Sequence, residues 1–300
     1  MKKLGKVLAD LLRSEAGRRR PMRILWRFFY WQWRQRVSSR PLEFRTVTGS
    51  KLSLVPREAG ALSGFYYLEL PDFEEQVFAL HLLRPGELFI DVGANQGGWT
   101  LLLAGAGSRV IAFEPVPATF ARMHRQIAGN TEQIRRLISA RQLALGEQSG
   151  TVDFTASLDE GNHRIAGDTN RMPGDIRVPL ETLDSALRDE TPFLIKIDVE
   201  GSELMVLQGA KKILKAPSLL GLIIETFRPH NHRQEKLIAL EAMLLELGFR
   251  PHAYDPWSRQ LRRLNASGEG AQNTIYARSD IDLQTRLKAA VAVTALACAI

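Results

Sequence analysis

The most constraining feature of the sequence is the stretch 89–100, which combines a strand, a glycine turn and the start of a helix. It begins as an apolar run that ends at Asp91 and Val92, passes through glycines at 93, 97 and 98, and continues into an apolar run from Trp99. Glycines permit a turn at positive φ and the close approach of a ligand, because they carry no Cβ. The following helix offers free N–H groups at its N-terminus. The stretch therefore predicts a strand–turn–helix unit that can bind a nucleotide-type ligand.

Two carboxylates distinguish between the cofactors that use such a turn. A dinucleotide places its pyrophosphate over the second glycine of a G-x-G-x-x-G turn, at a helix N-terminus that favours anions. Here the second position is Asn95, and the charge of Asp91 would repel a pyrophosphate but suits the ammonium and sulfonium groups of S-adenosylmethionine. Glu114 follows Gly93 by 21 residues, at the end of the apolar run 109–113, where it can accept hydrogen bonds from both ribose hydroxyls. Glycine-rich turns alone are common. With these carboxylates, we predict a cofactor site made of Asp91, Gly93, Asn95, Gly97 and Glu114.

A second charged turn lies in residues 193–203. Strand alternation puts Lys196, Asp198 and Glu200 on one face, and charges near the end of a central strand are costly unless they are paired or used. Ligands of doubly wound sheets bind beyond the carboxyl ends of the strands, where these residues and Asp91 would converge. The alternative is an internal Lys196–Asp198 ion pair, with Glu203 favouring its own helix N-terminus.

Strand and helix patterns alternate through the rest of the body. This alternation predicts an α/β fold with a doubly wound, mainly parallel sheet. A polar loop at 157–174 is long for a compact domain, so we interpret it as the wall or lid of the substrate pocket, with Asn162 and His163 as its most suggestive members. The alternative for His163 is a solvated loop histidine.

The N-terminal segment 1–45 differs in composition from the remainder. It holds 13 Lys or Arg against three Asp or Glu, a balance of +10 that leaves −3 for the rest of the chain. Its aromatic and basic residues suit a membrane surface, a packing or oligomer contact, or, with less support, nucleic acid. No apolar run is long enough to cross a bilayer, and Arg23 and Arg27 interrupt a signal-peptide core. The alternatives stay open at this point.

Composition sets the remaining bounds. A chain of 300 residues with 45% hydrophobic residues can bury a sizeable core. Its one cysteine, Cys298, cannot form an intrachain disulfide, and no paired metal thiolates occur, so we expect a cytoplasmic setting, with peripheral membrane contact as an option, and no metal. We expect a helical extension at 1–45, a lead-in segment at 46–85, a catalytic domain at 86–280 and an apolar helix at 281–300.

Residues 86–226 resemble the FkbM-type methyltransferases, a family of Rossmann-like S-adenosylmethionine-dependent enzymes. The resemblance rests on the joint order of FIDVGANQG at 89–97, FEP at 113–115, ALG at 144–146, TLD at 182–184, KIDVEG at 196–201 with Glu203, GA at 209–210 and IIE at 223–225. It implies a seven-stranded sheet with an antiparallel final hairpin and S-adenosylmethionine as methyl donor. It also implies methylation of a hydroxyl on a sugar, glycan or secondary metabolite. Leu145 and Asp198 join the cofactor-binding set on this basis.

A sugar hydroxyl is a poor nucleophile, so a positioned base should assist methyl transfer. Our hypothesis makes Asp198 or His163 that base, with Lys196 and Glu200 orienting the pair. A base-amino methyltransferase would show an Asn/Asp-Pro-Pro-Tyr/Phe motif where this chain has DVEG at 198–201, which disfavours nucleic acid. Asn95 and Asp91 disfavour a nicotinamide dehydrogenase. A methyltransferase-like scaffold at a membrane is the non-enzymatic alternative.

Overall fold

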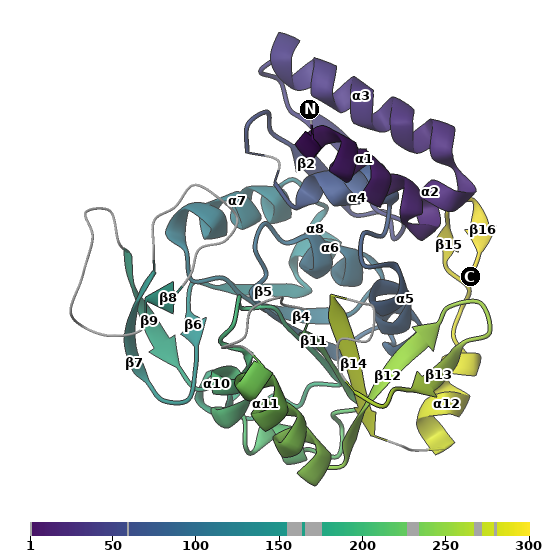
Figure 1. The fold of residues 1–300 in the computed structure, drawn as a ribbon. Coiled ribbons are helices and arrows are strands. Elements are labelled where there is room, and N and C mark those ends of the chain that lie inside the picture. The colour runs from purple at the N-terminus through teal and green to yellow at the C-terminus, as the bar shows by residue number, and fades with distance from the viewer. Residues whose placement is uncertain are drawn as a thin grey trace.

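A computed structural model describes residues 2–58, 60–154, 164–165, 176–226, 234–266, 272–278 and 281–300. Its centre is an eight-stranded sheet in the order β13-β12-β14-β11-β10-β3-β4-β5 (Figure 1). The strands are β3 Leu88–Val92, β4 Arg109–Phe113, β5 Ile138–Arg141, β10 Leu194–Ile197, β11 Gly221–Glu225, β12 Phe249–Asp255, β13 Gln260–Arg263 and β14 Asn273–Arg278. The five strands from β5 to β11 run parallel, and β14, β12 and β13 each run antiparallel to their neighbour.

This arrangement confirms the predicted doubly wound α/β class with an antiparallel hairpin, β12 and β14, near one edge. The sheet has one strand more than the seven expected. The additional strand is β13, which follows β12 along the chain, folds back and pairs with β12 from His252 to Asp255. Chain order reverses between β3 and β10, so these two central strands form the switch point at which such sheets bind ligands.

Helices cover both faces of the sheet. One face packs against α5 Phe73–Leu82, α6 Gly98–Gly105, α7 Pro117–Ala128 and α8 Glu132–Arg135, and the other against α9 Leu183–Leu187, α10 Glu203–Gln208, the short 3-10 helix Ile213–Lys215 and α11 Gln234–Glu246. Side chains alternate between the faces: Ile90 and Val92 enter the core under α10 and α11, whereas Phe89 enters the core under α5 and α6. Asp91 and Lys196 therefore point toward the α6 face.

A smaller sheet stands beside the central one. Its order is β6-β9-β7-β8, with β6 Ala144–Leu145, β7 Gly150–Phe154, β8 Arg164–Ile165 and β9 Ile176–Glu181. Strands β5 and β6 are close in sequence but belong to different sheets, because β5 joins the central sheet and β6 pairs with β9 in the smaller one. Apart from β8, the predicted pocket loop at 157–174 lies outside the described residues, and so does His163.

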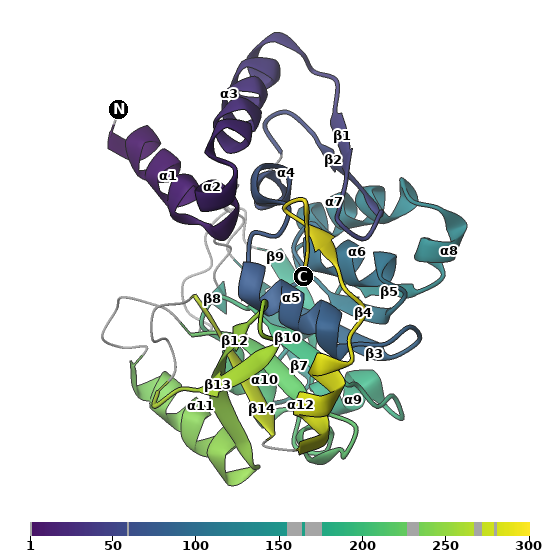
Figure 2. The same ribbon diagram turned by 90° about the vertical axis from the view of Figure 1, so that its right-hand side faces the viewer.

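Three helices precede the body. They are α1 Lys2–Arg13, α2 Glu15–Arg19 and α3 Pro21–Val37, and they are followed by the hairpin of β1 Leu42–Arg45 with β2 Lys51–Leu54 and by α4 Leu62–Leu68. Both views place α1 to α3 at one end of the molecule, on the far side of α4 from the sheet (Figures 1 and 2). The division into domains stays a prediction.

The C-terminal segment differs from the expected helix. Helix α12 spans Ile281–Lys288, and the chain then forms a small hairpin of β15 Thr294–Ala295 with β16 Cys298–Ala299. Helix is therefore the wrong prediction beyond Lys288. The segment carries β-branched residues at 291, 293, 294 and 300, which favour extended backbone, and Val293 and Ile300 exchange backbone hydrogen bonds.

The helices of the described residues differ in length and in apolar content. None of these helices is both long and apolar enough to cross a membrane.

Candidate functional site

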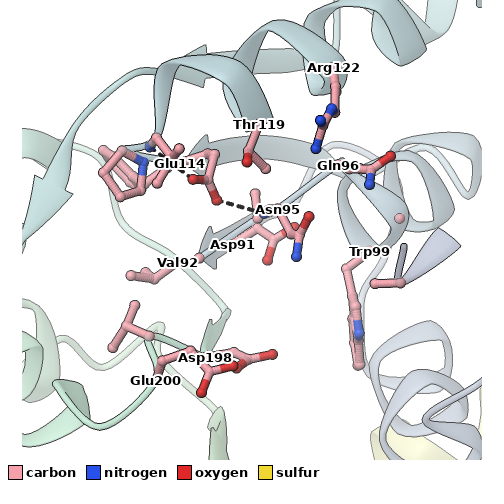
Figure 3. A pocket seen from close by; sticks show the side chains of 18 of the residues that line it. Asp91, Val92, Asn95, Gln96, Trp99, Glu114, Thr119, Arg122, Asp198 and Glu200 are labelled. Carbon is pink, nitrogen blue, oxygen red and sulfur yellow. Dashed lines mark hydrogen bonds between the residues drawn. The ribbon is translucent and has the colours of Figure 1, made fainter. Parts of the chain in front are cut away.

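A cavity of about 1050 Å³ lies at the carboxyl ends of β3, β4 and β10, next to the switch point (Figure 3). Its wall contains the backbone of the turn after β3 together with side chains from the strand ends, from the segment around α4 and from the smaller sheet. A space of this size at this place in a doubly wound sheet suits a nucleotide-containing ligand. The cavity brings together residues that are more than 100 positions apart in the sequence, including Asp91 and Asp198.

The glycine turn is shaped by close backbone contacts. Gly93 has φ 80°, and a Cβ at this position would lie 1.9 Å from the carbonyl oxygen of Asp198, so only glycine fits. Asn95 also has a positive φ, of 49°, a conformation that Asn tolerates better than most residues. Gly97 has φ 83° and faces Met123, outside the wall formed by the described residues. Its visible contribution is the entry into α6, whereas Gly93 and Asn95 line the cavity.

Asp91 is a fully buried carboxylate in the cavity wall. Its Oδ2 accepts a hydrogen bond of 2.7 Å from the Thr100 hydroxyl, whereas its Oδ1 has no hydrogen-bond partner among the described residues. Burial raises the pKa of Asp91, and the nearby charge of Lys196 opposes that rise. A buried carboxylate oxygen without a donor is costly. Its position in a cavity fits a ligand that brings a cationic or N–H group.

Glu114 lies at the end of β4, as the sequence predicted. Its two carboxylate oxygens accept hydrogen bonds from the backbone N–H groups of Val116, at 2.9 Å, and Asn95, at 3.0 Å. Burial raises the pKa of Glu114 to about 7, although both N–H groups favour its charged form. A carboxylate offers about four lone-pair sites, so it retains acceptor capacity for the hydroxyls of a ribose. Figure 3 shows Glu114 above the turn that carries Asn95.

Lys196 is buried between carboxylates. It stands beside Asp91 in the β3–β10 register, and its Nζ lies 3.0 Å from Oδ2 of Asp198. Although burial opposes its charge, the carboxylates of Asp198 and Asp91 raise the pKa of Lys196. Its ammonium also lies 5.8 Å from the ring centre of Trp99. The internal Lys196–Asp198 ion pair weighed as an alternative therefore exists, and both partners line the cavity.

The turn after β10 brings Glu200 to the same cavity. Glu200 has φ 53°, which is uncommon for a residue with a Cβ, and such strained positions cluster at functional sites. Glu203 accepts a hydrogen bond from the N–H of Gly201 and closes this turn at the start of α10. Leu145, from β6, is a further member of the wall.

Sequence reasoning did not single out Asp72, a carboxylate in the wall. Asp72 accepts a hydrogen bond of 2.9 Å from Nε1 of Trp99, and burial raises its pKa while that bond opposes the rise. In the sequence Asp72 only marks the start of the helix at 73–82, so its position gave no functional signal. It fixes the ring that faces Lys196, and both Asp72 and Trp99 line the cavity.

Three acidic residues also lie close together beside the cavity. Asp198, Glu200 and Glu225 each bring a carboxylate oxygen within 4.8 Å of the others. An acidic cluster alone does not define a metal site, and the expected absence of a metal stays a prediction.

Fold and site together define a class. The doubly wound sheet with its cavity at the switch point is of the Rossmann-like type, and it carries one carboxylate, Asp91, before its glycine turn and a second, Glu114, after the next strand. Residues 91–251 match the Methyltransferase FkbM domain, and the chain belongs to that family. S-adenosylmethionine is accordingly its methyl donor, and the unpartnered Asp91 oxygen and the Glu114 carboxylate fit the amino and ribose groups of this cofactor.

Several named proteins are similar to this chain. Methyltransferase sdnD of Sordaria araneosa is 25% identical over 62% of this chain and 81% of its own length. The 31-O-demethyl-FK506 methyltransferase FkbM of Streptomyces tacrolimicus is 29% identical over 49% and 68%. Hexuronic acid methyltransferase AglP of Haloferax volcanii is 28% identical over 42% of this chain. The matched part covers about half (51%) of the length of AglP. A solved methyltransferase FkbM from Methylobacillus flagellatus is 20% identical, with 72% of this chain and 52% of that chain covered and a TM-score of 0.45.

Proposed function

We propose that this methyltransferase acts on oxygen, and that its acceptor is a hydroxyl of a sugar, a glycan or a secondary metabolite. The observation that carries the proposal is the Lys196–Asp198 pair, which puts a carboxylate beside the cofactor turn within the same cavity. Two similar proteins support the acceptor class, because their names specify a hexuronic acid and a 31-O-demethyl compound. The whole protein's substrate is part of this proposal.

The residues divide into a binding set and a reacting set. S-adenosylmethionine supplies a methyl group on a positively charged sulfur. Asp91 would hold the amino group of the cofactor through Oδ1, and Glu114 would accept hydrogen bonds from its ribose hydroxyls. Gly93 leaves room for the Asp198 carbonyl, so the turn after β3 and the end of β10 can lie close together beside the cofactor.

Asp198 is the proposed base. The proton of the acceptor hydroxyl becomes acidic as the oxygen attacks, and a carboxylate within reach can accept it. Lys196 holds one Asp198 oxygen at 3.0 Å, which restricts the carboxylate to one orientation, and Glu200 would orient the acceptor from the neighbouring turn. His163 remains the alternative base and lies outside the described residues.

Matched Asp-to-Asn substitutions test this division. Asp198→Asn should lower turnover roughly a hundredfold or more while leaving the affinity for S-adenosylhomocysteine within about twofold. Asp91→Asn should instead weaken that affinity roughly a hundredfold, because it removes the charge that faces the cofactor amino group. Turnover is measured with radiolabelled donor on a panel of hexuronic acids, glycans and hydroxylated polyketides, and affinity by calorimetry.

The outcomes separate the alternatives. Unchanged turnover in Asp198→Asn would refute the base assignment and favour His163. A wild-type chain that binds no S-adenosylhomocysteine would favour the scaffold hypothesis. Methylation of nucleic acid in place of the panel would overturn the acceptor class. The cytoplasmic setting and any oligomer formed through residues 1–45 stay predictions.

A further inference from the structure

Helix α3 carries an apolar stripe on its outer side. Its members, each more than half exposed, are Met22, Trp26, Phe29, Trp33 and Val37. Their spacings of four, three, four and four residues place them within an arc of about 80° on a helix with 100° per residue. We call these five residues the α3 outer stripe. It runs along nearly the whole helix, which spans Pro21–Val37.

The opposite face of α3 is already occupied by the body. Ile24, Phe28 and Trp31 are buried, and the Phe28 ring lies 5.5 Å from that of Tyr67 on α4. Arg27 donates a hydrogen bond of 2.6 Å to the carbonyl oxygen of Tyr66. The helix is therefore held by a large inner face. Its outer stripe cannot be covered by rotating the helix without exposing residues of equal size.

The stripe is unusual for this molecule. Of the ten large hydrophobic residues that are exposed among the described residues, six lie within the first 37 positions, five of them in the stripe. Single exposed apolar residues need no explanation, but a contiguous row of them on one helix marks a contact surface. The row lies at the end of the molecule opposite α11 (Figure 1).

Charge indicates which partner this surface fits. Residues 1–45 carry a balance of +10, and Lys6, Arg36 and Arg40 are exposed within that segment. A second copy of the chain would bring an equal positive charge against the first, which disfavours close approach. An anionic lipid surface supplies the opposite charge, and tryptophan rings favour the headgroup level of a bilayer.

We propose that the α3 outer stripe enters the headgroup region of an anionic lipid bilayer, with α3 lying parallel to the membrane plane. The helix is about 25 Å long at 1.5 Å per residue, so it would present its whole stripe in that orientation. The aromatic rings would bury apolar surface in the bilayer, and the exposed Arg36 and Arg40 would attract anionic headgroups. This inference does not depend on the acceptor of methyl transfer.

Vesicle binding by the full chain tests the proposal. The probes are vesicles of phosphatidylcholine and phosphatidylglycerol in a two-to-one ratio, compared with phosphatidylcholine alone. The stripe variant carries Trp26→Gln, Phe29→Gln and Trp33→Gln. We expect it to lose roughly a hundredfold in partitioning onto the anionic vesicles, since three large side chains would no longer be buried. Wild-type binding should also weaken on neutral vesicles and at high salt.

A matched control removes exposed apolar side chains elsewhere. Ile238→Gln with Leu245→Gln, both on the exposed side of α11, should bind vesicles as the wild type does. Equal S-adenosylhomocysteine affinity in all three proteins verifies that the body is folded. Undiminished vesicle binding by the stripe variant would overturn the proposal. So would a wild-type dimer that the stripe variant converts to a monomer without any lipid binding, or stripe-dependent binding to a single-stranded oligonucleotide in place of lipid.

Discussion

The catalytic cavity and the outer side of α3 depart from the usual distribution of residues in opposite directions. In the cavity, Asp91 and Lys196 are charged and buried, whereas on α3 the rings of Trp26 and Trp33 are apolar and exposed. Buried charge and exposed apolar rows are the informative exceptions in a folded protein. In the cavity, neighbouring groups stabilise most of the buried charge: Lys196 pairs with Asp198, and the Thr100 hydroxyl donates a hydrogen bond to Asp91. Among the described residues of the cavity wall, the buried oxygen without a hydrogen-bond partner is Oδ1 of Asp91.

The outer stripe is covered much less: Trp26 and Trp33 contact the ring of Tyr30 but stay more than half exposed. Its five side chains face away from the body, while the inner face of the same helix packs on α4. This difference between the cavity and α3 indicates how large a partner each region can bind. One unsatisfied oxygen inside a cavity calls for a small group, and a row of exposed rings calls for an extended surface.

The largest expected effect separates the two faces of α3. Trp31→Ala should lower the free energy of unfolding by about 4 kcal/mol, because it empties a buried site, whereas Trp33→Ala should change it by less than about 0.5 kcal/mol. Circular dichroism during urea unfolding measures both. Trp31 is 2% exposed and Trp33 is 57% exposed.

If Trp31→Ala and Trp33→Ala lowered the free energy of unfolding equally, the distinction between a buried inner face and an exposed outer face of α3 would be wrong. A large loss in Trp33→Ala would mean that the stripe is covered by part of the chain itself. A negligible loss in Trp31→Ala would mean that α3 contributes little to the body. Either result would also remove the basis for a stable membrane-facing helix.

The second prediction concerns the charge balance of the cavity. Lys196→Met should lower the free energy of unfolding by about 3 kcal/mol, because it leaves the carboxylates of Asp91 and Asp198 without their cation. The surface pair of half-buried Lys51 with exposed Glu43, 2.7 Å apart, provides a control, and Lys51→Met should cost about 0.5 kcal/mol or less.

A double variant sharpens this result. Adding Asp198→Asn to Lys196→Met removes one of the two uncompensated charges and should restore part of the lost stability. If the free energy lost in the double variant equals the sum of the losses in the two single variants, the two residues act independently and the proposed coupling is wrong. The comparison is made by urea unfolding at one pH for all four proteins.

Much of the cavity could be predicted because its determinants are local in sequence. The turn after Asp91 has glycines at fixed offsets, and Glu114 and Asp198 stand at the ends of apolar runs that could be recognised as strands. Parallel strands then bring their carboxyl ends to one edge without further information. For the same reason the fold class and the neighbourhood of Lys196 and Asp198 followed from pattern alone.

Other features depend on long-range packing that no local pattern encodes. Asp72 becomes part of the wall only because Trp99, on another helix, reaches it. The edge strand β13 and the C-terminal hairpin were missed for another reason. Each pairs with a segment only a few residues away, Asp255 with Gln260 and Ala295 with Cys298, but these strands are too short to show a periodic pattern. The aromatic content of residues 1–45 was visible in the sequence, but which rings face inward depends on contact with α4.

The smallest expected effect tests the charge state of the cavity through pH. Burial raises the pKa of Glu114 to about 7, and its charged form is the better acceptor for ribose hydroxyls. Affinity for S-adenosylhomocysteine should therefore fall as pH decreases through about 7, by roughly tenfold between pH 8 and pH 6, because one pKa unit corresponds to a factor of ten.

The same group affects stability with a definite sign. Its pKa is higher in the folded chain than the ordinary value of 4.5, so the folded state binds more protons between these values. Its contribution to the free energy of unfolding should decrease as pH rises from about 4.5 to about 7. Glu114→Gln should remove both trends while lowering the affinity at pH 8, as calorimetry and urea unfolding across this range can show. A pH dependence of affinity that persists unchanged in Glu114→Gln would assign it to another group.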